Sequence, residues 1–198
     1  MKYIYGLNIS GQSIIEYFFT NHILFFAWDD DEQRRKEVEN KYQEIRFAHP
    51  QDLDWSIISE AYISPGIDLN IKSLSKSRYF KTLLYRDLEL YSQITDNKKI
   101  IAVTGTNGKS TTVKLIGELL KSNGLDTYVG GNFGPPLMNV YNKKYIYNYH
   151  VIELSSYQLE AAPSFSSFIS ILLNISDDHQ DRYKSLIDYA RTKENILI

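Results

Sequence analysis

Residues 100–111 read IIAVTGTNGKST, and this stretch decides the fold of the second half of the chain. Ile100–Thr104 is apolar and mostly β-branched, a composition typical of a buried strand. The residues that follow it are Gly105, Thr106, Asn107, Gly108, Lys109, Ser110 and Thr111. Glycines between a buried strand and a helix let backbone N–H groups turn inward, where they bind phosphate oxygens. The stretch therefore predicts a nucleotide phosphate loop, with a helix over Lys109–Ser122 behind it.

Two side chains of the loop suit a nucleoside triphosphate and its metal. Lys109 supplies a mobile positive charge for the β- and γ-phosphates, and the Ser110 hydroxyl is a ligand for Mg²⁺. The spacing departs from the usual phosphate-loop pattern, because Val103 occupies the position of its first glycine. A glycine-rich turn without a ligand is the alternative interpretation. The Lys-Ser-Thr run at the start of a helix favours the phosphate site.

Strand and helix patterns alternate along the whole chain, which predicts an α/β fold. We expect an N-terminal Rossmann-like domain over residues 1–95 and an incomplete P-loop-type ATPase domain with a mainly parallel sheet over residues 96–198. The elements expected in the first domain are strands at 2–7, 23–28 and 55–59 and helices at 13–21, 32–42 and 79–94. Further strands are expected at 99–104, 127–130, 150–154 and 170–174, and a last helix from Ser185.

Composition limits the classes of partner. The formal net charge of the 198 residues is −2, which gives no field for non-specific binding of nucleic acid or of an anionic membrane. There is no cysteine, so disulfides and thiolate catalysis are excluded. No apolar run approaches the roughly 18 residues that span a bilayer, and the start lacks a cleavable signal. We therefore expect a soluble, cytoplasmic protein.

Five segments in order carry a resemblance to a known family. They are the phosphate loop at 104–111, GGNFG at 130–134, ELSSYQLE at 153–160, NISDDHQDRY at 174–183 and YARTK at 189–193. Together they resemble the Mur ligases, whose phosphate loop is also short. The segment at 153–160 is most similar to the member that adds D-glutamate to UDP-N-acetylmuramoyl-L-alanine. The first 95 residues match more loosely.

The resemblance implies an ATP-dependent amide ligase of cell-wall peptidoglycan synthesis, with Mg²⁺ as the metal. Its small-molecule substrates are UDP-N-acetylmuramoyl-L-alanine and D-glutamate, and it forms an acyl phosphate before the amide. The family also has a C-terminal domain that presents the amino acid. Because the final apolar helix runs to the end of this sequence, we expect a truncated chain, which is either the fragment of a longer gene or is completed by a separate chain. An inactive remnant that binds UDP-sugar or nucleotide, and another P-loop enzyme such as a small kinase, are the alternatives.

The resemblance also assigns roles to four residues of the second domain. Glu153 ends a strand and matches a Mg²⁺ ligand, although an isolated strand-end acid usually faces solvent. His179 matches a residue near the metal and the muramoyl-alanine, and Asn132 matches a contact to the same substrate, although an Asn in a glycine-rich loop is usually a turn former. Lys193 matches a lysine that carbon dioxide carbamylates, which turns a cation into an anion able to bind a second Mg²⁺.

In the first domain the expected UDP-sugar contacts lie in three turns. Ser10 and Gly11 stand at the start of the first helix, where a diphosphate is bound. Asp29 ends the second strand, where a ribose or base contact is expected. The turn of Ser64, Pro65 and Gly66 resembles one that faces the UDP-sugar in the family. By themselves these are ordinary tight turns.

Overall fold

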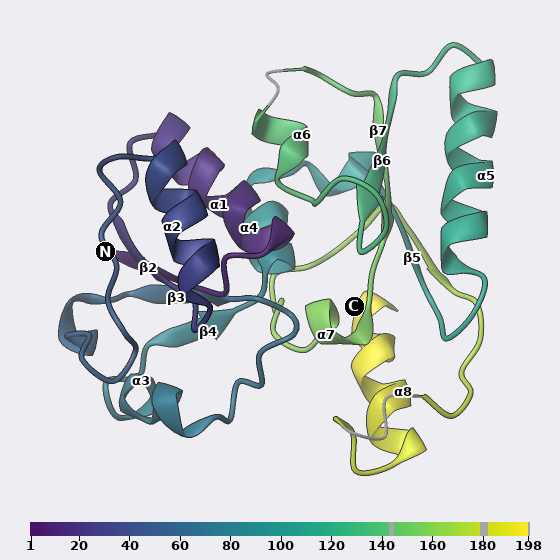
Figure 1. Cartoon of the computed structure of the whole chain (residues 1–198). Helices are drawn as coiled ribbons and strands as arrows, with labels where there is room; N and C mark the ends of the chain where they lie inside the picture. Colours follow the sequence, from purple (N-terminus) through teal and green to yellow (C-terminus); the bar gives the residue numbers. More distant parts are fainter. Residues whose placement is uncertain (143–144, 179–181, 198) are drawn as a thin grey trace. The chain divides into compact units, whose positions relative to one another are not determined.

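The computed structural model describes residues 1–142, 145–178 and 182–197 (Figure 1). The chain divides into two compact units, Met1–Asp87 and Leu88–Ile198. Each unit is a parallel sheet with helices between its strands, as the sequence predicts. The division lies eight residues before the expected boundary at residue 95. Helix α4 (Asp87–Ile94) accounts for this, because Glu89 accepts a hydrogen bond from the Ser164 amide at 2.9 Å, within the second unit.

The first unit contains a four-stranded sheet in the order β2-β1-β3-β4, and every pair is parallel. Its elements are β1 (Lys2–Tyr5), α1 (Ile9–Thr20), β2 (Phe25–Trp28), α2 (Glu32–Lys41), β3 (Glu60–Ile63), α3 (Ser75–Tyr79) and β4 (Leu83–Tyr85). As the acids after β2 suggested, Asp31 caps α2 by accepting a hydrogen bond from the Gln33 amide at 2.9 Å. Tyr3 and Trp55, whose rings meet edge to face at 5.2 Å, lie in the core of this unit.

Two expectations for the first unit are wrong. The strand predicted at 55–59 is a short 3-10 turn at Trp55–Ile57, because Asp54 accepts a hydrogen bond from the Ser56 amide and caps that turn. The strand begins only at Glu60. The single helix predicted at 79–94 is instead α3, strand β4 and α4. The helical conformation does not continue past Lys81, whose φ is 55°. Leu83 then pairs with Glu60, as the first residue of an edge strand.

The second unit has the strand order β6-β7-β5-β8, again with parallel pairs only. After α4 its elements are β5 (Ile100–Thr104), α5 (Lys109–Ser122), β6 (Thr127–Gly131), α6 (Asn139–Asn142), β7 (Tyr149–Glu153), α7 (Ser156–Leu159), β8 (Ile169–Leu172) and α8 (Leu186–Glu194). Helix α5 has the bounds that the sequence predicts, and it packs on β6 and β7. Ser185 caps α8, at the expected start of the last helix.

Candidate active site

The carboxyl ends of three strands meet at one edge of the second sheet. In the register of the sheet, Glu153 at the end of β7 stands beside Val103 of β5 on one side and beside Gly131 of β6 on the other. The residues that follow these strands are therefore neighbours. Open parallel sheets bind their ligands at this edge, so the register alone identifies the candidate site.

The phosphate loop is curled, as the sequence predicts. Gly105 and Gly108 have φ of 152° and 85°, a region that favours glycine, and α5 starts directly at Lys109. The first turn of an α-helix has no intrahelical acceptors for its N–H groups, and the N-cap residue Gly108 has no side chain to satisfy them. The amides at the start of α5 are therefore available to an anion.

The other half of the loop is bonded within the fold. The Thr106 amide donates to the carbonyl of Asn174 at 3.0 Å, and the Asn107 amide donates to the Asn174 side chain at 2.9 Å. Asn174 follows β8 and closes the exchange by donating from Nδ2 to the Asn107 carbonyl at 3.0 Å. Only the amides at the start of α5 are therefore left for an anion, and Asn174 holds the first half of the loop in place. Asn174 opens the motif at 174–183, but its sequence context alone indicates no role for it in the loop.

Lys109 lies folded over its own loop. Its ammonium donates to the carbonyls of Gly105 at 2.8 Å and Thr106 at 2.9 Å. These contacts hold a positive charge at the mouth of the loop while its remaining amides stay open. A triphosphate would offer the ammonium a stronger, charged acceptor than two carbonyls.

Glu153 is the centre of the polar constellation, and its side chain is buried with a residue exposure of only 2%. Its Oε2 accepts a hydrogen bond from the Ser110 hydroxyl at 2.6 Å, and its Oε1 accepts one from Asn132 Nδ2 at 2.9 Å. The Asn132 amide also donates to the Glu153 carbonyl at 2.9 Å. The interpretation of Glu153 as a solvent-facing acid is therefore wrong. The carboxylate joins the helix after the phosphate loop to the glycine-rich loop after β6.

Gly131 explains why the two loops come so close. Its φ is 108°, and a Cβ at this position would stand 2.3 Å from the Glu153 carbonyl oxygen. Only glycine therefore allows the chain to turn here and to place Asn132 against Glu153. Gly131 is therefore the glycine of the motif at 130–134 that this close approach requires.

Lys193 is buried, with 1% of its surface exposed, although a lysine on a helix normally faces solvent. Its ammonium donates to the Gly105 carbonyl at 2.9 Å and to the Thr104 hydroxyl at 3.3 Å. Burial, reinforced by the nearby charge of Lys109, lowers the pKa of Lys193 from 10.5 to about 8. Lys193 lies on α8, and Thr104 ends β5, 89 residues earlier in the sequence. The fold thus brings the lysine against the start of the phosphate loop.

The side-chain oxygens of Ser110 and Glu153 suit a magnesium ion. Mg²⁺ prefers oxygen ligands, and the Ser110 hydroxyl and Glu153 carboxylate provide two oxygens 2.6 Å apart. A cation would replace the hydrogen bond between them. Among the described residues, no group of three or more His, Asp or Glu side chains is arranged to hold a metal. The fit therefore depends on these two oxygens and on further ligands such as phosphate. His179, the other residue expected near the metal, lies outside the described residues.

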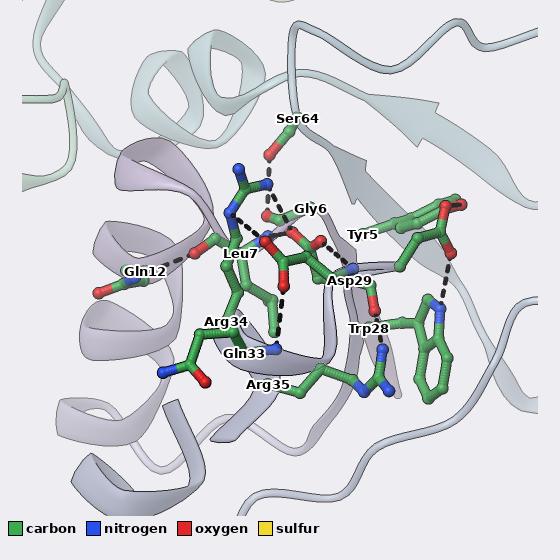
Figure 2. A network of polar contacts seen from close by, with 12 residues as sticks. Tyr5, Gly6, Leu7, Gln12, Trp28, Asp29, Gln33, Arg34, Arg35 and Ser64 are labelled. Atoms are coloured by element: carbon green, nitrogen blue, oxygen red, sulfur yellow. Dashed lines mark hydrogen bonds and ion pairs between the residues drawn. The ribbon is translucent and has the colours of Figure 1, made fainter. Parts of the chain in front are cut away.

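Two of the expected contacts of the first unit, Asp29 and Ser64, lie in one network of polar contacts around Gly6 and Leu7 (Figure 2). Strand β1 ends in Gly6, whose φ is 97°, and the Ser64 hydroxyl donates to the Gly6 carbonyl at 2.8 Å. A Cβ on Gly11 would lie 1.9 Å from the same carbonyl oxygen, so the start of α1 can approach β1 only with glycine there. The turns after β1 and β3 are therefore held against each other. The strand order reverses between these two strands, which is the position where such sheets bind ligands.

Asp29 is buried and already has internal partners (Figure 2). Its carboxylate accepts hydrogen bonds from the Leu7 amide at 2.6 Å and from the Asp31 amide at 2.9 Å, and Arg34 lies 3.6 Å away. It fixes the loop after β1 and the start of α2. Ser10 accepts a hydrogen bond from the Ser13 hydroxyl through its carbonyl at 2.7 Å. Pro65 and Gly66 continue the turn of Ser64, and Gly66 is exposed.

Within the ranges that the structure describes, no helix has both the length and the apolar character needed to cross a lipid bilayer.

Comparison with known proteins links this geometry to a family. Residues 103–197 match the Mur ligase middle domain. A UDP-N-acetylmuramoylalanine--D-glutamate ligase of Wolbachia pipientis wMel is 39% identical over 196 residues, which cover 98% of this chain and 38% of that protein. A Rickettsia prowazekii protein of the same name is 36% identical, and the aligned part covers 98% of this chain and 43% of that protein. The chain thus spans about two fifths of the length of these curated relatives.

Solved structures agree on the fold. A UDP-N-acetylmuramate:L-alanyl-gamma-D-glutamyl-meso-diaminopimelate ligase from Neisseria meningitides matches with a TM-score of 0.60 at 15% identity, covering 98% of this chain and 66% of that one. The UDP-N-acetylmuramate-alanine ligase of Thermotoga maritima matches with a TM-score of 0.56 at 21% identity, covering 98% and 46%. The matched middle domain contains the phosphate loop, Glu153 and Lys193, and the named relatives align along nearly the whole sequence, so this chain carries the middle domain of the Mur ligase family.

Proposed function

We propose that this chain supplies the UDP-sugar-binding and ATP-binding parts of a cytoplasmic ligase that joins D-glutamate to UDP-N-acetylmuramoyl-L-alanine. The names of its Wolbachia and Rickettsia relatives support this substrate pair. The observation that carries the proposal is the Ser110–Glu153–Asn132 constellation beside the open amides of the phosphate loop. It combines a triphosphate cradle with an acidic metal ligand and an amide at the substrate side.

ATP binding requires one rearrangement in the phosphate loop. Lys109 leaves the carbonyls of Gly105 and Thr106 and moves to the β- and γ-phosphate oxygens. The amides of Gly108, Lys109, Ser110 and Thr111 bind the phosphates from below, at the positive end of the α5 dipole. Thr106 and Asn107 keep their bonds to Asn174 and hold the shape of the loop.

The proposed reaction has two steps. A carboxylate oxygen of the alanine attacks the γ-phosphorus, the bond to the ADP oxygen breaks, and an acyl phosphate forms. The amine of D-glutamate then attacks the acyl carbon, loses a proton and expels phosphate, which leaves the amide. The residues of this site contribute positioning and charge neutralisation, which supply most of the catalysis in phosphoryl transfer. Asn132 and His179 orient the muramoyl-alanine part of the substrate.

Bound Mg²⁺ would neutralise phosphate charge, and the Ser110 hydroxyl and the Glu153 carboxylate would hold it. Lys193 fits a metal only after modification, because an ammonium repels a cation. Its neutral amine attacks carbon dioxide, a C–N bond forms and a proton leaves, so that the product is an anionic carbamate. The lowered pKa of Lys193 supports this role, because it makes the neutral amine available near neutral pH.

The UDP part of the substrate is assigned to the first unit. Ser10 and Gly11 at the start of α1 are the proposed diphosphate contacts, and Ser64, Pro65 and Gly66 form the facing turn. Asp29 is the proposed ribose or base contact, and it would accept further hydrogen bonds beside its internal ones. The D-glutamate site would come from residues outside this sequence, since the chain spans about two fifths of its relatives.

The decisive assay separates binding from turnover. Purified chain is mixed with ATP, Mg²⁺, UDP-N-acetylmuramoyl-L-alanine and D-glutamate, and phosphate release is measured together with calorimetric binding of ATP and of the UDP-sugar. We expect binding of both ligands, and turnover only when the remainder of a ligase is supplied as a second polypeptide. Lys109→Ala should abolish ATP binding, and Lys121→Ala at the far end of α5 serves as the control. Unchanged ATP affinity in the Lys109 variant would refute the phosphate-site assignment.

A further inference from the structure

Arg86 is the buried residue whose position calls for a function. It follows β4 directly, and none of its surface is exposed. Its Nη1 donates to the carbonyls of Ile63 at 3.1 Å, Ser64 at 2.8 Å and Ile67 at 3.0 Å. Removing a guanidinium from water costs free energy, which these hydrogen bonds to buried carbonyls offset.

The three acceptors lie at the end of β3, in the case of Ile63, and in the turn that follows it, in the case of Ser64 and Ile67. This turn is closed by the Ile67 amide, which donates to the Ser64 carbonyl at 2.9 Å. Pro65 has no N–H group and Gly66 has no side chain, so the middle of the turn can contribute few contacts of its own. The buried guanidinium of Arg86 instead supplies hydrogen bonds to the carbonyls on either side of these two residues.

The same turn lies against the loop after β1, where the UDP site is proposed. The Ser64 amide donates to the Tyr5 carbonyl and the Ser64 hydroxyl donates to the Gly6 carbonyl, both at 2.8 Å. Arg86 thus fixes Ser64, and Ser64 fixes the loop at the end of β1. A chain of direct hydrogen bonds therefore runs from an edge strand of the sheet to the point where the strand order reverses.

We propose that Arg86 is a positioning residue that pre-forms the uridine-diphosphate crevice by holding the turn at 64–67 against Gly6. This rests on the proposed function, which assigns the crevice to UDP. Arg86 itself touches no ligand. Without it the turn has to be ordered during binding, and that ordering reduces affinity.

The test compares two ligands on the same preparations of the whole chain. Arg86→Met keeps much of the side-chain volume but removes the donors, and Arg86→Lys keeps one donor group. We expect Arg86→Met to weaken binding of UDP by about ten-fold or more and Arg86→Lys to lie between it and the native chain, because ordering of a loop is added to the cost of binding. ATP affinity should stay within about two-fold, because its loop belongs to the other compact unit.

A matched control is Arg78→Met. Arg78 lies in the same unit and donates to the Leu69 carbonyl at 3.3 Å, but it is exposed. This variant loses one arginine charge without disturbing the turn at 64–67, and its UDP affinity should equal that of the native chain. Equal losses in the Arg78 and Arg86 variants would mean that net charge alone sets the affinity, and would overturn the proposal.

Amide hydrogen exchange gives a readout that needs no ligand. The amides of Ser64 and Ile67 should exchange faster in Arg86→Met than in the native chain, while those of β5 should not change. If the native chain fails to bind UDP, the assignment of the crevice is wrong, but the exchange rates still show whether Arg86 holds the turn. If Arg86→Met does not fold, Arg86→Lys decides by the same two measurements. Native exchange rates together with native UDP affinity in a folded variant would refute the role of Arg86.

Discussion

Lys193 should react with carbon dioxide near neutral pH, whereas an ordinary surface lysine should not. Carbamylation needs the neutral amine, and burial beside Lys109 lowers the pKa of Lys193 from 10.5 to about 8. At pH 7.5 about one quarter of Lys193 would then be neutral, against about one thousandth for a lysine at the ordinary value. The advantage in reactive amine is therefore more than about a hundred-fold.

The assay uses ¹³C-labelled bicarbonate at fixed dissolved carbon dioxide between pH 6.5 and 9.5. The carbamate is followed by its carbon resonance and is located by trapping and peptide mapping. Lys193→Arg should remove the signal, and the exposed Lys121 on α5 serves as the internal control. If the modification of Lys193 rises with the same pH dependence as that of Lys121, or does not occur in this range, the reasoning from burial is refuted.

The lowered pKa of Lys193 also makes the stability of the folded chain depend on pH. Below pH 8 the buried ammonium destabilises the folded state, and at high pH both states are neutral. Between pH 8 and 10.5 the unfolded chain binds more protons, so the free energy of unfolding should rise with pH by up to ~3 kcal/mol from this group. Lys193→Met should lack this rise. Denaturation of the native chain and of this variant is measured over the same pH range, and the difference between them separates the contribution of Lys193 from that of tyrosines that titrate at similar pH.

Three further predictions concern other contacts. Gly11→Ala should lower the free energy of unfolding by about 2–3 kcal/mol, because the new Cβ would lie 1.9 Å from the Gly6 carbonyl oxygen. Gly66→Ala has open space around it and should leave the free energy of unfolding unchanged. Equal melting temperatures of the two variants would contradict this prediction. The Lys114 ammonium lies 4.6 Å from the centre of the Phe133 ring. A double-mutant cycle of Lys114→Met and Phe133→Ala should give a coupling free energy of about 0.5–1 kcal/mol, and Lys114→Arg should preserve it. Additive effects of the two substitutions would exclude a stabilising contact. Glu153→Gln should remove the Mg²⁺ dependence of ATP binding measured by calorimetry, and a native Mg²⁺ titration in that variant would exclude Glu153 as a ligand.

Local sequence was sufficient for the features that neighbouring residues control. The apolar run at 100–104, its glycines and the Lys-Ser-Thr after them predict β5 to within one residue, a tight loop after it, and α5 with its observed bounds. The acids after β2 predict the cap of α2. In each case backbone geometry and capping depend on residues within one or two turns, so the pattern carries the information.

Local sequence failed where a distant strand decided the conformation. The segment 79–94 has apolar residues that suit a helix, yet Leu83–Tyr85 pairs with β3 as an edge strand. Nothing near Arg86 in the sequence indicates full burial, because its acceptors lie about twenty residues earlier in another turn, with Ile67 19 residues away. Pairing energies between segments override local propensity, and they are not encoded in any single window.

The sequence by itself determined the family's motifs and their order along the chain. Only the tertiary structure decided which of these residues meet, and in what state. The parallel register places Asn132 and Glu153 side by side, and the packing of α8 buries Lys193 against Gly105. The physical reason is that a pKa and a hydrogen bond depend on burial and on distance, and both are set by contacts between elements far apart in sequence.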